Sequence, residues 1–184
     1  MRISTYSIEY AIQGMEDITD AIGVVYQQDG HHFYCLTFPD CDRTFVYDVN
    51  TSLWHERANL TEGDWTQFEA RGHAFFAGKH LVYDYSEGNI YSLDMDVHSY
   101  GDTERKWMRS FRVPTNSMAR IRHSRLQLDI EAGTGLIDGT NLNVMMRFSD
   151  DGGHTWSKEQ WRSAGEVGEY HKRVIWNRLG ITKG

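Results

Sequence analysis

The feature that most constrains this fold is a strand–turn–strand unit that recurs along the chain. Each copy has alternating apolar and polar residues, a turn and a late tryptophan, and the copies occupy residues 45–57, 90–109 and 145–157. They are spaced roughly 45 to 55 residues apart, the length of one propeller blade. The pattern predicts an all-β, β-propeller-like fold built from consecutive four-stranded antiparallel blades.

Turn signals divide the chain into short strands of this kind. The first predicted blade holds residues 22–28, 31–38, 44–49 and 53–58, the second 71–77, 81–85, 89–95 and 104–111, and a weaker third 120–130, 143–149 and 154–163, followed by a strand at 171–178. Only residues 4–13 and 15–22 could form one or two turns of helix.

About three blades and a partial one are too few to close a ring, because propellers usually need four to eight. Residues 180–184 also complete no element. We therefore expect residues 1–184 to form a single β-propeller-type domain or a propeller fragment. Either the chain is part of a longer protein, or its sheets pack as a sandwich or an open stack.

Composition limits the functions open to this chain. Its net charge of −7 argues against a protein that grips nucleic-acid phosphates, so we expect no sequence-specific nucleic-acid binding. Cys35 and Cys41 form no metal-binding pair and are expected to be free thiols. The first residues lack a signal-peptide core, and no apolar run is long enough to span a membrane. We therefore expect a protein that is made in the cytoplasm and has no membrane partner.

The sharpest local motif is the run 149–156, which matches the Asp-box pattern of sialidases and many other β-propellers. Its pattern residues are Ser149, Asp151, Gly153, Thr155 and Trp156. Asp151 can accept backbone N–H groups, Gly153 can adopt a conformation that a Cβ forbids, and Trp156 can turn back into the core. We interpret the motif as a structural lock on a hairpin.

A glycan-binding or sialidase-like propeller is the alternative function that this motif raises. Such an enzyme needs an arginine cluster for the substrate carboxylate and a Tyr–Glu nucleophile pair. Arg120, Arg122 and Arg125 lie close together in the sequence. Glu169 and Tyr170 are adjacent, however, and adjacent residues of a strand point to opposite faces. We therefore predict no catalytic residues.

The sequence has no strong metal or cofactor motif. His31, His32, His73 and His80 could in principle assemble a metal site, but no HExxH spacing occurs. The glycine-rich run 133–139 departs from the dinucleotide-binding pattern. We therefore predict no metal and no cofactor. We interpret the arginines of residues 120–125 as solvated, ion-paired or facing an acidic partner, and a phosphate-facing surface is the alternative.

Several segments together resemble a known family. They are residues 4–10, 20–22, 26–39, 46–57, 78–91 and 147–180. In order and spacing they resemble the C-terminal half of the phage packaged-DNA stabilization proteins, the tail accessory factors of short-tailed phages. The resemblance covers nearly the whole chain, but family members look longer, with an N-terminal half that has no counterpart here.

This resemblance implies a virion structural protein of the head–tail junction rather than an enzyme. Such proteins join the tail below the portal after packaging, form a ring, help to retain the DNA and present a platform for the tail needle. The implied partners are further copies of the chain in a ring-forming oligomer, the portal and adaptor proteins, and the tail needle, all within the virion tail. A generic β scaffold that presents a surface to another protein is the third interpretation.

Overall fold

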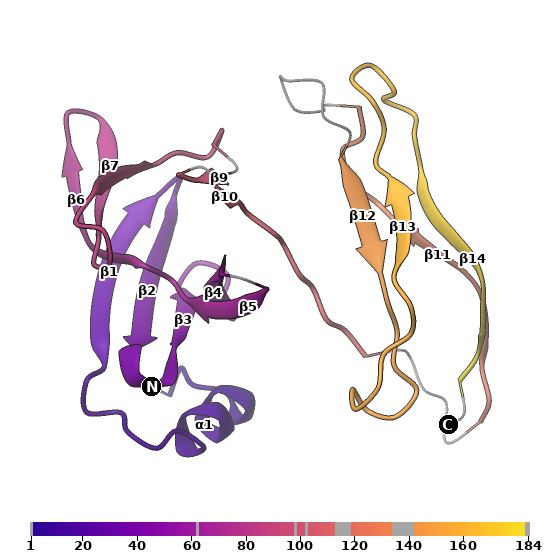
Figure 1. The fold of residues 1–184 in the computed structure, drawn as a ribbon, viewed down its shortest axis with the longest axis horizontal. Helices are drawn as coiled ribbons and strands as arrows, with labels where there is room; N and C mark the ends of the chain where they lie inside the picture. The colour runs from indigo at the N-terminus through magenta and orange to yellow at the C-terminus, as the bar shows by residue number, and fades with distance from the viewer. Residues whose placement is uncertain are drawn as a thin grey trace. The chain divides into compact units, whose positions relative to one another are not determined.

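The computed structural model describes residues 2–61, 63–97, 99–101, 103–112, 119–133 and 142–182 (Figure 1). These residues consist mainly of strands and turns, which confirms the all-β prediction. They form two compact units, unit 1 (Met1–Arg109) and unit 2 (Ser110–Gly184), each with a core of its own. No helix among the described residues has the length and apolar character to cross a membrane.

Unit 1 begins with a short helix, α1 (Tyr6–Gln13). Thr5 precedes it with extended backbone, and its hydroxyl caps the helix by accepting an amide hydrogen bond of 3.4 Å from the first turn. The helix predicted for residues 15–22 does not form. Instead, the Asp17 carboxylate accepts hydrogen bonds from the amide and hydroxyl of Thr19, an Asx turn that competes with helix.

The first sheet of unit 1 has five antiparallel strands in chain order. They are β1 (Ile22–Gln28), β2 (His31–Phe38), β3 (Arg43–Asp48), β4 (Leu53–Thr61) and β5 (Asp64–Gln67), with a 3-10 turn, η1 (Pro39–Cys41), between β2 and β3. Asp29 and Gly30 both have positive φ, 49° and 78°, and make the tight turn from β1 to β2. The Asp–Gly pair predicts this hairpin, whereas β5 is an additional strand that the sequence analysis misses.

The second sheet of unit 1 has three antiparallel strands, again in chain order. They are β6 (Ala70–Phe76), β7 (Lys79–Asp84) and β8 (Ile90–Leu93), and two short strands, β9 (Ser99–Tyr100) and β10 (Thr103–Glu104), pair with each other further along. A bulge interrupts β6 at Gly72, where φ is 53° and an added Cβ would come within 2.4 Å of the Tyr83 ring. The strand predicted for residues 104–111 is wrong beyond Glu104, because residues 105–112 pair with no strand of the described residues.

The two sheets of unit 1 share a core. Alternate residues of β1, β2 and β3 point to one side of the first sheet, and the buried cluster there contains Tyr26, Cys35 and Val46, with Val24, Phe33 and Leu93 packed against it. Leu93 comes from β8, and β1 lies beside β6. The second sheet therefore covers this face of the first.

Unit 2 contains two antiparallel strand pairs. β11 (Arg122–Leu128) pairs with β14 (Val174–Ile181), and β12 (Asn143–Met146) pairs with β13 (Gln160–Ser163) (Figure 1). The core contains Ala164, Val174 and Trp176, against which Leu126, Val144, Met146 and Leu179 pack. Because these side chains come from both pairs, the two pairs face one another across the core.

The strand order of unit 2 differs from the predicted four-stranded blade. β11 pairs with β14, and β12 and β13 lie between these two strands in the sequence. In each main sheet of unit 1, by contrast, neighbouring strands follow one another along the chain. The strand predicted for residues 154–163 is also too long, since only Gln160–Ser163 forms one and a loop precedes it. The number of blades stays a prediction.

Candidate functional site

The predicted motif residues of unit 2 gather in one loop between β12 and β13. Ser149 Oγ donates to Asp151 Oδ1 at 2.7 Å and accepts the amide hydrogen of Gly153 at 2.8 Å. Asp151 accepts the amide of Thr155 at 2.8 Å and its hydroxyl at 2.6 Å. Gly153 has φ of 98°, a conformation that favours glycine. These contacts close the loop on itself.

Hydrogen bonds from the hydroxyl and amide of Thr155 hold the pKa of Asp151 at about 2, so the loop is locked around an ionised carboxylate. Trp156 does not turn fully into the core, since 46% of its surface is exposed and the Arg147 guanidinium lies 4.9 Å from its ring centroid. The donors to Asp151 all come from the loop itself. The arrangement is suited to a structural role, and its identity as an Asp box stays a prediction.

The arginines considered for a sialidase-like site do not meet this loop in any hydrogen bond or ion pair of the described residues. Arg122 and Arg125 lie on β11, paired with Ile181 and Asn177 of β14, and Arg120 precedes the strand. None of the three lines the two cavities found in unit 1.

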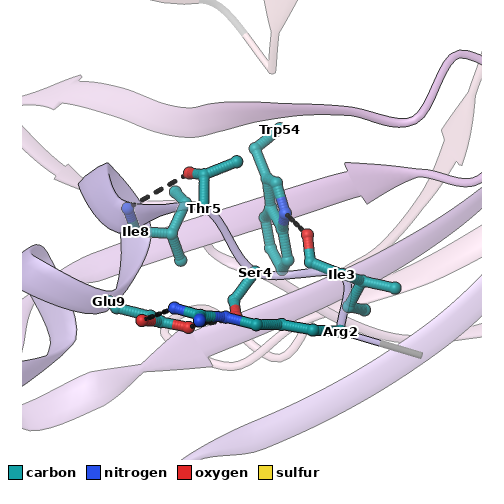
Figure 2. Close-up of polar contacts among 7 residues, drawn as sticks. All are labelled: Arg2, Ile3, Ser4, Thr5, Ile8, Glu9 and Trp54. Atoms are coloured by element: carbon teal, nitrogen blue, oxygen red, sulfur yellow. Dashed lines mark hydrogen bonds and ion pairs between the residues drawn. The ribbon is translucent and has the colours of Figure 1, made fainter.

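The N-terminal segment of unit 1 is tied to β4 by polar contacts, which Figure 2 shows. The carbonyl of Ile3 accepts a hydrogen bond from the indole N–H of Trp54 at 2.9 Å. Glu9, in the first turn of α1, accepts hydrogen bonds from the Ser4 hydroxyl and the Arg2 guanidinium, which lower the pKa of its carboxyl. These contacts fix the start of α1 beside the first sheet.

Helix α1 presents two tyrosines to solvent. Tyr6 and Tyr10 are 84% and 81% exposed, and their spacing of four residues puts them on one face of the helix. The Arg2 guanidinium lies 5.3 Å from the centroid of the Tyr6 ring. Tyrosine and arginine are enriched among the residues that dominate binding energy at protein interfaces. This α1 tyrosine face (Tyr6 and Tyr10) is therefore a candidate interaction surface.

The outer face of the second sheet carries exposed apolar side chains, with Lys79 opposite Phe76 and Ser92 opposite Leu81. We define it by Phe76, Leu81, Tyr83 and Ile90, which the strand register places on the side opposite the buried Val82. Phe76 and Ile90 are each 71% exposed and Tyr83 is 52% exposed. Several exposed apolar side chains on one sheet face are typical of a protein–protein contact.

Unit 1 also has an open cleft of about 410 Å³. Its charged and large aromatic lining residues include Trp65, Glu69, Glu87, Tyr91, Arg105 and Lys106. Burial and the nearby carboxylate of Asp84 raise the pKa of Glu69. Sequence reasoning missed this cleft, because its residues come from separate segments that no local spacing connects.

The histidines predicted as possible metal ligands divide between two places. His73 Nε2 and His80 Nδ1 are 3.0 Å apart, whereas His31 contacts Asp48 at 2.7 Å and His32 contacts Asn50 at 3.0 Å. In the part of the chain that the structure describes, no three potential ligands gather as a metal site would require.

Comparison with known families divides the chain much as the structure does. A family model described as bacteriophage P22 Gp10, beta-propeller, matches residues 1–98, and a second, described as bacteriophage P22 Gp10, beta-sandwich, matches residues 106–183. No curated protein matches the chain. The boundary between the two matches lies close to the boundary of the units at Arg109, and the third predicted repeat falls in the sandwich-type part.

Proposed function

Because the chain belongs to the bacteriophage P22 Gp10 family of packaged-DNA stabilization proteins, we propose that it closes the portal channel and retains the packaged DNA. It is a phage structural protein, and the observation that carries the proposal is the match of both units to the propeller and sandwich models of one family. In this proposal the chain has no enzymatic role and acts in the tail of the virion.

The charge of the chain supports retention by blockage. A net charge of −7 gives the protein the same sign as DNA, so tight binding to the phosphate backbone is disfavoured. Aromatic contacts within the sheets, such as Tyr47 with Trp54 at 5.1 Å and Tyr26 with Phe33 at 5.2 Å between ring centroids, favour a stiff body. A stiff, acidic plug would hold DNA back by bulk and mild repulsion.

The exposed surfaces of unit 1 suggest how such a plug is held. Copies of an acidic chain repel each other, so contact between them is best made through apolar surface. We assign the outer face of the second sheet to a neighbouring copy in a ring. We assign the α1 tyrosine face to the portal or adaptor protein, and the platform for the tail needle would form once the ring has assembled.

The test is a binding and retention experiment. The mass of the purified chain would be measured alone and after mixing with a portal–adaptor complex from a related phage, and phage particles carrying each variant would be assayed for DNA release. We expect stable addition of the chain to the complex, and at least a tenfold loss of affinity in the double variant Tyr6→Ala, Tyr10→Ala, because hot-spot residues each contribute about 2 kcal/mol or more.

The matched control is Tyr170→Ala, since Tyr170 is 68% exposed but belongs to unit 2. We expect this variant to bind and to retain DNA like the unchanged chain. A chain that remains free in the presence of the complex, with particles that keep their DNA without it, would refute the proposal.

A further inference from the structure

A buried arginine in unit 1 has unsatisfied donors. Arg71, on β6, is only 4% exposed. Its Nη2 donates to Gln67 Oε1, and its guanidinium lies 4.5 Å from the centroid of the Tyr85 ring. Its Nε and Nη1 atoms are buried and have no hydrogen-bond partner. Such orphaned donors are rare in folded proteins, because each costs free energy unless something accepts its hydrogen.

A second guanidinium lies in the same region. Arg57, on β4, donates to the hydroxyl of Tyr26, and its guanidinium lies 5.5 Å from the Tyr26 ring centroid and 5.1 Å from that of Phe33. Among the described residues, no carboxylate forms an ion pair with Arg57 or Arg71. Two positive charges therefore lie in or near the core of unit 1 without an ion-pair partner among the described residues, which is costly.

Arg57 and Arg71 both line a small cavity between the first sheet and the second. The cavity has a volume of about 20 Å³, enough for one particle the size of a water molecule. Its other polar lining residues are Tyr26, Cys35, Thr37 and His73, and the remainder are apolar residues and glycine. No aspartate or glutamate is among the lining residues.

We propose that this cavity binds a single monatomic anion, for which chloride is the natural candidate, between Arg57 and Arg71. Guanidinium groups have five N–H donors and no acceptor, so they are matched by an occupant that only accepts. A halide is such an occupant and supplies the missing negative charge. A water molecule carries no charge and would leave the two guanidinium groups without a counter-charge. Sulfate and phosphate are too large for the cavity.

The ion would join the two sheets of unit 1, because Arg57 belongs to β4 and Arg71 to β6. A halide that binds the folded state but not the unfolded state raises the free energy of unfolding of unit 1 by mass action. At chloride concentrations of about ten times the dissociation constant, we expect unit 1 of the full chain to melt roughly 5–10 °C higher than in chloride-free buffer. Sodium gluconate at equal ionic strength should give no such rise.

Variants separate this site from general salt effects. Arg71→Leu should abolish the difference between chloride and gluconate, since it removes one of the two cationic walls. Arg43→Leu is the matched control, because Arg43 is paired with Glu56 at 2.7 Å on the surface, and its removal should leave the chloride response unchanged. Equal melting temperatures of the unchanged chain in chloride and in gluconate would overturn the proposal.

Crystallography of the unchanged chain gives a test that does not depend on how a variant folds. Crystals grown in sodium bromide should show an anomalous peak in the cavity, within hydrogen-bonding distance of Arg71 Nε or Nη1. Density in the cavity without anomalous signal would identify water and would overturn the proposal, as would an empty cavity at high bromide.

Discussion

Replacing Trp176 by alanine should unfold unit 2 alone. Trp176 is 2% exposed and lies at the centre of the small core that joins the two strand pairs, and its indole N–H donates to the Gln160 carbonyl at 2.9 Å. Truncation of a buried tryptophan to alanine costs about 3–5 kcal/mol. A unit as small as Ser110–Gly184 rarely has a free energy of unfolding above about 3–5 kcal/mol. The cost of the substitution therefore equals the entire stability of unit 2.

Hydrogen exchange followed by mass spectrometry resolves the two units in one experiment. In Trp176→Ala, peptides from β11 to β14 should lose their protection, while peptides from β1 to β8 serve as an internal reference. Trp161→Ala is the control, since Trp161 lies on β13 and is 55% exposed, and it should keep most of the protection. Full protection of unit 2 in Trp176→Ala would refute the reasoning that this side chain holds the two strand pairs together.

Three further changes test single contacts. Gly133→Ala should cost unit 2 about 1–3 kcal/mol more in urea unfolding than Gly168→Ala, because both have positive φ but only the first Cβ would meet backbone, at 2.7 Å; equal costs would contradict this. The folded pKa of Asp151, about 2, lies below its ordinary value, so the carboxylate stabilises the loop above about pH 4 and this stabilisation is lost as pH falls toward 2. In Asp151→Asn this acid-induced loosening of the loop should disappear. The measurement is hydrogen exchange of the loop amides against pH, and a pH profile equal to that of the unchanged chain would contradict the prediction. Tyr100→Phe removes the 2.5 Å hydrogen bond to the buried Asp84 carboxylate and should cost unit 1 about 1–3 kcal/mol in urea, and a loss near zero would refute that role.

The hairpins of unit 1 could be predicted because their signals are local. Alternation over seven or eight residues indicates one buried face, and an Asp–Gly or Ala–Gly pair at positive φ fixes the turn and hence the register. The motif loop of unit 2 was also within reach, since the hydrogen bonds among its motif residues join residues at most four apart. The exposure of Trp156 was not, because it depends on what else packs against the loop.

The cavity with Arg57 and Arg71 could not be predicted from the sequence. Both arginines stand in strands, and an arginine in a strand is usually solvated. Their burial results from the packing of the second sheet on the first, which brings β4 and β6 to one cavity. The bulge at Gly72 contributes, because it interrupts the regular alternation of side chains on β6 next to Arg71.

The recurrent strand pattern predicted the first half of the chain better than the second for a physical reason. A propeller blade and a sandwich sheet both need strands with one apolar face and a turn between them, so the pattern itself does not distinguish the two. What distinguishes them is whether strands of one sheet follow each other in the chain. They do so in each main sheet of unit 1, whereas in unit 2 the first described strand pairs with the last. Pairing β11 with β14 requires closing a long loop, and this costs conformational entropy before the strand contacts compensate for it. We therefore expect unit 2 to fold more slowly than the hairpins of unit 1.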